Sequence, residues 1–256
     1  MTRARSPIRR IVAVMVVVLL GAVPTTFLAR SAQALPTKSQ QLSAPFSWQG
    51  MKWCPSFGSW DGCDTVQNPS LFTVSFAPSQ VSESGSAIVL TMNHSATSSG
   101  AINTYDEETW TPPATLTAKI TLACNASGQI VNWPAFWAVG TTGTWPAQGE
   151  IDILEGLGGK ATWTYHYVNA SGQDASVGGA PAGNWCGTHT YAADWQSSSI
   201  SFTWDGKKVG QVTSSQIGVP IASDPMAVIF DYGANPAYGG PTTGGTAMSI
   251  SSYSAA

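Results

Sequence analysis

Short stretches in which apolar and polar positions alternate recur along most of the chain. They are rich in β-branched and aromatic residues, and Gly, Pro, Ser, Asn or Asp residues separate them. Alternation with a period of two residues is typical of a strand with one buried face. We therefore expect strands at residues 71–76, 87–92, 114–122, 162–168, 199–204 and 226–232.

The pattern predicts no helix long enough to connect two parallel strands. Asp205-Gly206, which lies between two alternating stretches, predicts a two-residue hairpin. Many short strands without crossover helices indicate an all-β fold, an antiparallel β-sandwich or jelly roll. The sequence contains no internal repeat, so residues 45–256 are expected to form a single domain.

The first 34 residues differ in character from the rest. Four arginines near the start precede an apolar run at 11–23, and a small-residue cleavage site follows at 32–34. This order predicts a signal peptide at 1–34 and a secreted, extracellular protein, with a short polar tether at 35–44. A membrane anchor would need about 20 apolar residues. Pro24 ends the run before that length.

Charged residues make up only 10% of the chain, against about 25% in an average soluble domain. Cleavage after residue 34 would remove all five arginines and leave six lysines against fourteen acids, a formal charge of −8. Nucleic acid, anionic lipid and sulfated polymers need clustered or bidentate cations. The composition therefore favours a neutral partner, without nucleic acid and without a membrane once the signal is removed.

The chain has four cysteines, Cys54, Cys63, Cys124 and Cys186. In an exported protein this number suggests two disulfides, for which three pairings are possible. Cys54 and Cys63 flank a short Pro- and Gly-containing loop and form the expected local bridge, which leaves Cys124 to pair with Cys186. The alternative is one or two free buried thiols, which oxidise readily in an exported chain.

Residues 150–155 hold three carboxylates, Glu150, Asp152 and Glu155, with apolar residues between them. Glycines bound this segment, so a helix is not expected. On a regular strand Glu150 and Asp152 share one face, whereas Glu155 falls on the other. A β-bulge at 153–154 would return Glu155 to the face of the first two acids.

Such a row of acids can serve the hydrolysis of a glycosidic bond. Retaining glycosidases place two carboxyl groups about 5–5.5 Å apart, one as an ionised nucleophile and one as a protonated acid. Crowding of three carboxylates raises at least one pKa, and the shorter Asp152 would then tune a glutamate. Two other interpretations stay open: an ordinary solvated strand face, and a calcium site of hard oxygen ligands.

Aromatic residues surround these acids in the sequence. Trp133, Trp137 and Trp145 lie within 17 residues of Glu150, and His166 lies on the next expected strand. Indole rings stack on the apolar faces of sugars, so this composition suits an uncharged polysaccharide. Trp133 and Trp137 are four residues apart and would share a strand face. The alternatives are that these tryptophans fill the core and that His166 is structural.

The motifs WPAFW (133–137) and WPAQGEIDILE (145–155) resemble the signature of glycoside hydrolase family 16, the laminarinase-like endo-β-glucanases. Weaker similarity extends over residues 72–252. The resemblance implies a concanavalin-like β-jelly roll with a substrate cleft on its concave sheet. It also implies Glu150 as the nucleophile, Asp152 as its assistant and Glu155 as the acid/base.

The same resemblance assigns substrate-binding residues to the cleft: Trp133, Trp137, His166 and, at one end, Trp110 with the weaker candidate Tyr105. Two segments depart from the family pattern. Residues 113–121 read PATLTAKIT where the family usually has a strand like YGRFEARIK, so a cleft arginine and acid are missing. The last strand lacks an aspartate that accompanies a structural calcium, so no cofactor or metal is expected.

The leading hypothesis is a secreted, monomeric, retaining endo-glycosidase that hydrolyses internal β-1,3 or mixed β-1,3/1,4 bonds of a neutral glucan. Two alternatives keep the same cleft: a non-catalytic, lectin-like carbohydrate-binding module, and a cell-wall transglycosylase. A pure binding module has no need of all three acids, which argues against the first alternative.

Overall fold

The computed structural model describes residues 46–55 and 71–256. The expected signal peptide at 1–34, the tether at 35–44 and Cys63 lie outside the described residues. No helix of the described part is long and apolar enough to cross a membrane.

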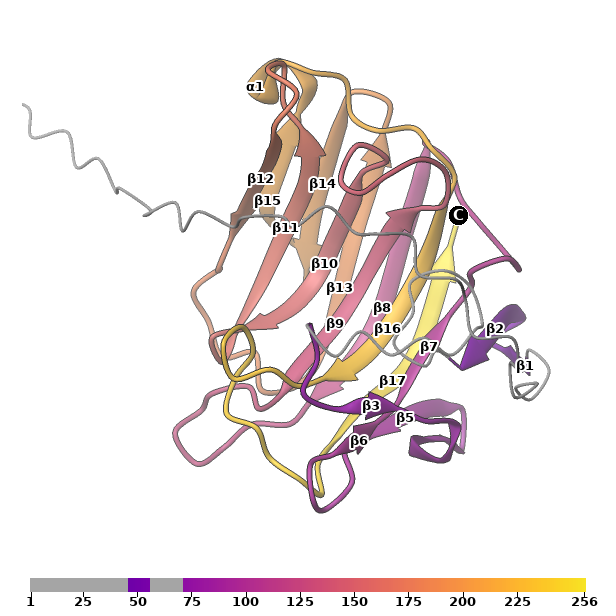
Figure 1. Cartoon of the computed structure of the whole chain (residues 1–256), viewed down its shortest axis with the longest axis vertical. Helices are drawn as coiled ribbons and strands as arrows, with labels where there is room; N and C mark the ends of the chain where they lie inside the picture. The colour runs from indigo at the N-terminus through magenta and orange to yellow at the C-terminus, as the bar shows by residue number, and fades with distance from the viewer. Residues whose placement is uncertain (1–45, 56–70) are drawn as a thin grey trace, which may run out of the picture. The chain divides into compact units, whose positions relative to one another are not determined.

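One antiparallel sheet has eight strands in the order β1-β2-β7-β16-β9-β10-β11-β12 (Figure 1). In chain order these strands are β1 (Phe46–Trp48), β2 (Met51–Pro55), β7 (Ala101–Asn103), β9 (Trp133–Gly140), β10 (Glu150–Leu157), β11 (Lys160–Val168), β12 (Asp174–Gly179) and β16 (Met226–Gly233). Strands β9 to β12 follow one another in both sequence and sheet, which is the usual outcome of short connections.

A second antiparallel sheet has seven strands in the order β15-β14-β13-β8-β17-β5-β4. These are β4 (Val81–Ser84), β5 (Ala87–Thr91), β8 (Ala114–Leu122), β13 (Gly187–Gln196), β14 (Ser199–Trp204), β15 (Lys207–Thr213) and β17 (Ala247–Ala255). The short parallel pair β3 (Ser75–Phe76) and β6 (Ser98–Ser99) is separate. The described helices are one turn each, η1 (Pro78–Gln80) and α1 (Ser214–Ile217).

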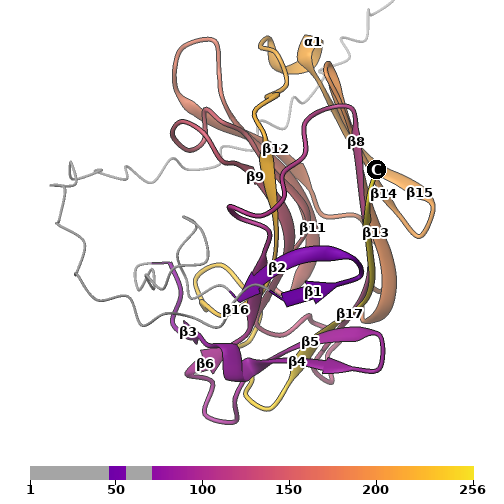
Figure 2. The same cartoon turned by 90° about the vertical axis from the view of Figure 1, so that its right-hand side faces the viewer.

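The two large sheets lie face to face as layers (Figure 2). Fully buried apolar side chains fill the space between them, such as Phe136 and Ile151 from the first sheet and Leu116 and Phe202 from the second. Burial of each such side chain stabilises the fold by roughly 1.5–3 kcal/mol. The expected antiparallel β-sandwich is thereby confirmed.

The expected strands agree with the structure except at residues 71–76, where only Ser75 and Phe76 are in a strand. Phe72 and Val74 are buried, so alternation is present, but it reflects packing rather than a sheet ladder. The Asp205-Gly206 hairpin is confirmed: both residues have positive φ angles, 47° and 73°, and join β14 to β15. Two positive φ angles are the mark of a type I′ turn.

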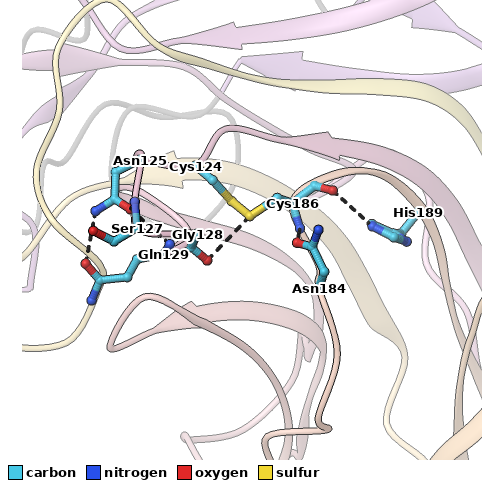
Figure 3. Close-up of a disulfide and its surroundings, with 8 residues drawn as sticks. All are labelled: Cys124, Asn125, Ser127, Gly128, Gln129, Asn184, Cys186 and His189. Carbon is cyan, nitrogen blue, oxygen red and sulfur yellow. Dashed lines mark hydrogen bonds between the residues drawn. A yellow bond between two sulfur atoms is a disulfide. The ribbon is translucent and has the colours of Figure 1, made fainter.

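A disulfide joins Cys124, just after β8, to Cys186, just before β13 (Figure 3). Its Cα atoms are 5.7 Å apart across 62 residues of sequence, which agrees with the pairing expected for these two cysteines. The expected partner of Cys54 is Cys63, which the structure does not describe.

Candidate active site

The three acids lie on β10, and this strand contains the bulge that the sequence predicts. Relative to β9 the register shifts between Asp152 and Leu154, and relative to β11 it shifts between Asp152 and Glu155. Ile151, Ile153 and Leu154 are fully buried in the core between the sheets. The extra residue therefore brings all three acids to the opposite face of the sheet. We call this face, which carries Glu150, Asp152 and Glu155, the outer face.

The bulge is held from the core side by the second sheet. The indole N–H of Trp204, on β14, donates a hydrogen bond of 3.1 Å to the carbonyl oxygen of Ile153. A bulge disrupts the ladder locally, and this bond ties the carbonyl of the bulged segment to the second sheet.

His166 on β11 is the direct cross-strand neighbour of Glu150. Its Nε2 lies 3.3 Å from Oδ2 of Asp152 and 3.8 Å from Oε1 of Glu150. The side chain of Asp152 is only 6% exposed, against 16% for Glu150 and 27% for His166. The expectation that His166 accompanies the acids is therefore met by its position.

Each glutamate also receives an indole N–H. Trp145 donates to Oε2 of Glu150 over 3.1 Å, and Trp133 donates to Oε1 of Glu155 over 2.8 Å. The ring of Trp145 is 49% exposed and lies 5.7 Å from the imidazole of His166. Such bonds orient both carboxyl groups and leave the second oxygen of each available for chemistry.

Asp231 on β16 is a fourth acid of this face, which the sequence analysis did not identify. It is 2% exposed, and its Oδ1 accepts a 2.8 Å hydrogen bond from the indole N–H of Trp137. In the sheet it stands opposite Ala135, which in turn stands opposite Glu155. The available signal was an aspartate inside the apolar run MAVIFDY, where an unpaired acid is costly unless it has a role.

Burial raises the pKa of every acid in this cluster, and mutual repulsion adds to it. The pKa of Asp152 rises to about 8 through burial and then through Asp231, and that of Asp231 rises to about 7 chiefly through burial. The pKa of Glu155 rises to about 8 through burial and Asp152, against the lowering effects of Trp133 and His166. The face therefore retains protons at neutral pH.

The pKa of Glu150 is also raised well above its ordinary value. Burial is the largest cause, followed by the charge of Asp152, while His166 and the hydrogen bond from Trp145 act in the opposite direction. Several carboxyls that hold protons thus lie close to His166, which favours the ionised form of Glu150. An acid and a nucleophile with different protonation states can coexist in such surroundings.

A second aromatic pair lies at the Glu155 end of the row. Tyr238, in the loop between β16 and β17, is 52% exposed, and its ring lies 5.4 Å from that of Trp133. A Cβ on the neighbouring Gly239 would come within 2.9 Å of the Cβ of Trp133, so this close approach requires glycine. The sequence analysis did not identify Tyr238. Exposed rings therefore flank the acids at both ends, Trp145 at one and Tyr238 at the other.

Trp110, expected at one end of the cleft, is half-buried: its backbone pairs with Met226, and its ring packs against the core, 6.3 Å from that of Tyr253 on the second sheet. The segment that lacks the family's cleft arginine and acid forms β8, which belongs to the sheet opposite the carboxylates. Tyr105, by contrast, packs against the cluster that contains Trp137 on the outer face.

Two glutamates brought to one face by a bulge, with exposed aromatic rings beside them on a β-sandwich, define the class of protein as a glycoside hydrolase. Within that class the chain belongs to glycosyl hydrolases family 16, whose family model matches residues 68–247. The match contains every acid of the outer face.

Individual relatives are more distant. Glucan endo-1,3-β-glucosidase A1 of Niallia circulans is 34% identical over 95 residues, which are 33% of this chain and 14% of that protein. The chain thus spans only a small part of that relative's length.

Solved structures show the same fold. A family 16 endo-glucanase from Bacteroides ovatus, in complex with G4G3G-2F-DNP, has a TM-score of 0.61 at 19% identity, over 80% of this chain and 94% of that one. An endo-1,3-β-glucanase from Streptomyces sioyaensis has a TM-score of 0.59 at 21% identity, over 88% and 98%.

Proposed function

We propose that this protein is a secreted retaining endo-glycosidase that hydrolyses internal β-1,3 or mixed β-1,3/1,4 bonds of a neutral glucan. The observation that carries the proposal is the pairing of Glu150 and Glu155 on one face of β10, each with an indole N–H on one oxygen. The relatives named for endo-1,3-β-glucan cleavage support the choice of substrate.

In the first step, Glu155 donates its proton to the glycosidic oxygen while Oε1 of Glu150 attacks the anomeric carbon. The bond to the leaving sugar breaks, and a covalent glycosyl-enzyme forms with inverted configuration. The pKa of about 8 for Glu155 supports its role as the acid, since the group then holds a proton at neutral pH. Burial raises the pKa of Glu150 as well, but His166, 3.8 Å away, and the hydrogen bond from Trp145 oppose that rise and so favour the ionised form that a nucleophile needs.

In the second step, the ionised Glu155 takes a proton from water, and the resulting oxygen attacks the same anomeric carbon. Glu150 leaves as a carboxylate, and the second inversion restores the original configuration. Asp152 stands between the two glutamates and is too short to reach the anomeric carbon easily. Its role in the proposal is to orient Glu150 and to influence its charge.

The substrate class follows from the character of the outer face. Trp145 and Tyr238 offer exposed rings on either side of the acids, and aromatic rings stack on the apolar faces of uncharged sugars. No arginine occurs after residue 30, so a sulfated polymer would find no bidentate cation. Exposed rings at both ends of the acid row suit a chain that continues in both directions, hence endo cleavage.

The assignment of Glu150 is tested by rescue with a small anion. Glu150→Ala should hydrolyse laminarin at least about 10²-fold more slowly than the wild type, whereas sodium azide with an activated glucoside should restore turnover. Proton NMR should then show an α-glycosyl azide, because azide attacks from the face that the glutamate vacates. Glu83→Gln, on the exposed part of β4, is the matched control and should leave the rate unchanged.

Other outcomes identify the alternatives. An α-azide formed by Glu155→Ala instead would exchange the two roles. Normal laminarin, lichenan and agarose binding without any hydrolysis by the wild type would indicate a lectin-like module. Products longer than the supplied oligosaccharides would indicate a transglycosylase.

A further inference from the structure

Three potential metal-binding atoms converge at the Glu150 end of the outer face. They are Nε2 of His166, Oδ2 of Asp152 and Oε1 of Glu150, and all lie within 4.8 Å of one another. They come from the paired strands β10 and β11, so the sheet itself fixes their spacing. Potential ligands on a rigid element are better positioned than ligands on a loop.

These atoms do not satisfy one another by hydrogen bonding. Oδ2 of Asp152 is buried and has no hydrogen-bond partner in the described part of the chain, although His166 Nε2 is 3.3 Å away. The hydrogen bond from Trp145 engages Oε2 of Glu150, not the Oε1 that faces His166. A buried acceptor without a partner is costly, and a cation between the three atoms would remove that cost.

We propose that Glu150, Asp152 and His166 form a binding site for one Zn²⁺ ion, which blocks the catalytic centre reversibly. Zinc takes nitrogen and oxygen ligands at about 2.0–2.2 Å, so two ligands of a tetrahedral ion stand roughly 3.3 Å apart. The separation of His166 from Asp152 is 3.3 Å and that from Glu150 is 3.8 Å. A small movement of the partly exposed Glu150 side chain completes the set.

The donor set favours zinc over the hard divalent cations. Calcium takes six to eight oxygen ligands, and magnesium keeps most of its waters, so neither suits two carboxylates and an imidazole. Three protein ligands leave the fourth tetrahedral position to water. The bound ion would hold the oxygen of Glu150 that attacks the anomeric carbon, so inhibition by zinc rests on the proposed function. Binding itself does not.

The test is calorimetric titration of the purified protein, carrying no polyhistidine tag, with zinc chloride. We expect one ion per chain, and affinity at least about tenfold lower in His166→Ala and in Asp152→Asn. His94→Ala removes an exposed histidine elsewhere and should bind zinc as the wild type does. Asp152→Asn keeps the side-chain shape, so unchanged melting temperature with lost binding identifies a ligand. Cobalt(II) should give the visible absorption of a tetrahedral ion in the wild type and not in these two ligand variants.

Zinc should also inhibit hydrolysis in competition with substrate, and a chelator should restore the rate. Equal zinc affinity in wild type and His166→Ala, loss of binding in His94→Ala, or no binding at all would overturn the site. Zinc bound at the three residues without any effect on hydrolysis would overturn the inhibitory role. Glu155→Gln separates the two proposals: it should slow hydrolysis by about 10²–10⁴-fold yet still bind zinc, and if it hydrolyses normally the proposed function fails alone.

Discussion

The two sheets present outward faces of opposite character. On β8 the residues that point away from the core, such as Thr115 and Lys119, are exposed, so buried and accessible positions alternate. On β9 and β16 every residue is buried, on both faces. The outward face of β8 contacts solvent, where threonine and lysine need no partner. The outer face of the other sheet buries carboxylates, which lowers stability. A role of these acids in a reaction would explain why they occur there.

The largest expected effect distinguishes an acid of the outer face from an acid of the opposite sheet. Glu155→Gln should lower kcat by about 10²–10⁴-fold, the usual worth of general acid–base catalysis. In the wild type kcat should fall as the pH rises through about 8, because Glu155 then loses the proton that it must donate. The measurement is laminarin hydrolysis from pH 5 to pH 10.

The matched control for that experiment is Asp194→Asn, on the exposed side of β13. It should leave both the rate and the pH profile unchanged. A wild-type profile that stays flat through pH 8 would contradict the assignment of Glu155 as the acid.

The next effect concerns the stability cost of the buried acids. The folded-state pKa of Asp231 is raised to about 7, well above the ordinary value of an aspartate, so its contribution to stability is complete below about pH 4 and is lost as the pH rises through 7. Asp231→Asn keeps an acceptor for Trp137 and removes the charge. Between pH 4 and pH 8 the unfolding free energy of the variant should therefore fall less than that of the wild type. The difference should be a few kcal/mol, at about 1.4 kcal/mol per pKa unit. Urea unfolding at several pH values measures it, and a decline identical to that of the wild type would contradict it.

A smaller effect is expected where the two sheets touch the bulge. Trp204→Phe keeps most of the packing and removes the hydrogen bond to Ile153, which should cost about 1–3 kcal/mol of stability. Because this bond holds the bulge that places Glu155, kcat should also fall. Trp195→Phe removes a comparable indole bond, whose acceptor is Ala222 rather than a residue of β10. It should lower the melting temperature but not kcat, and equal loss of kcat in both variants would show that the bulge needs no such support.

The smallest effect belongs to the plain face of β8. Lys119→Gln should change stability by no more than about 0.5 kcal/mol and leave hydrolysis unchanged, as surface substitutions usually do. Thermal unfolding and a laminarin assay measure both. A clear loss of activity would mean that this face also contributes to function, which would remove the contrast between the sheets.

The strands and the acid row could be predicted because both depend on local periodicity. Strands β8 and β14 agree with their expected bounds, and the bulge at 153–154 followed from the need to place Glu155 with Glu150. Residues 71–74 were misassigned because alternation reports burial, and burial also occurs in loops that pack on a core. The surroundings of Trp110 could not be predicted, because the sequence does not show which sheet a side chain packs against.

The sequence by itself determined the β-sandwich, the three acids of one strand and the family, since each depends on residue type and spacing within a short stretch. Only the tertiary structure decided what surrounds the acids. Asp231 and Tyr238 come from β16 and from the loop after it, which are far from β10 in the chain. His166 was expected on the neighbouring strand, but the register of β10 and β11 sets its distances to Glu150 and Asp152. Burial of the acids, and hence the raised pKa of each, likewise arises only in the folded sheet, where β9 and β16 are buried along their whole length.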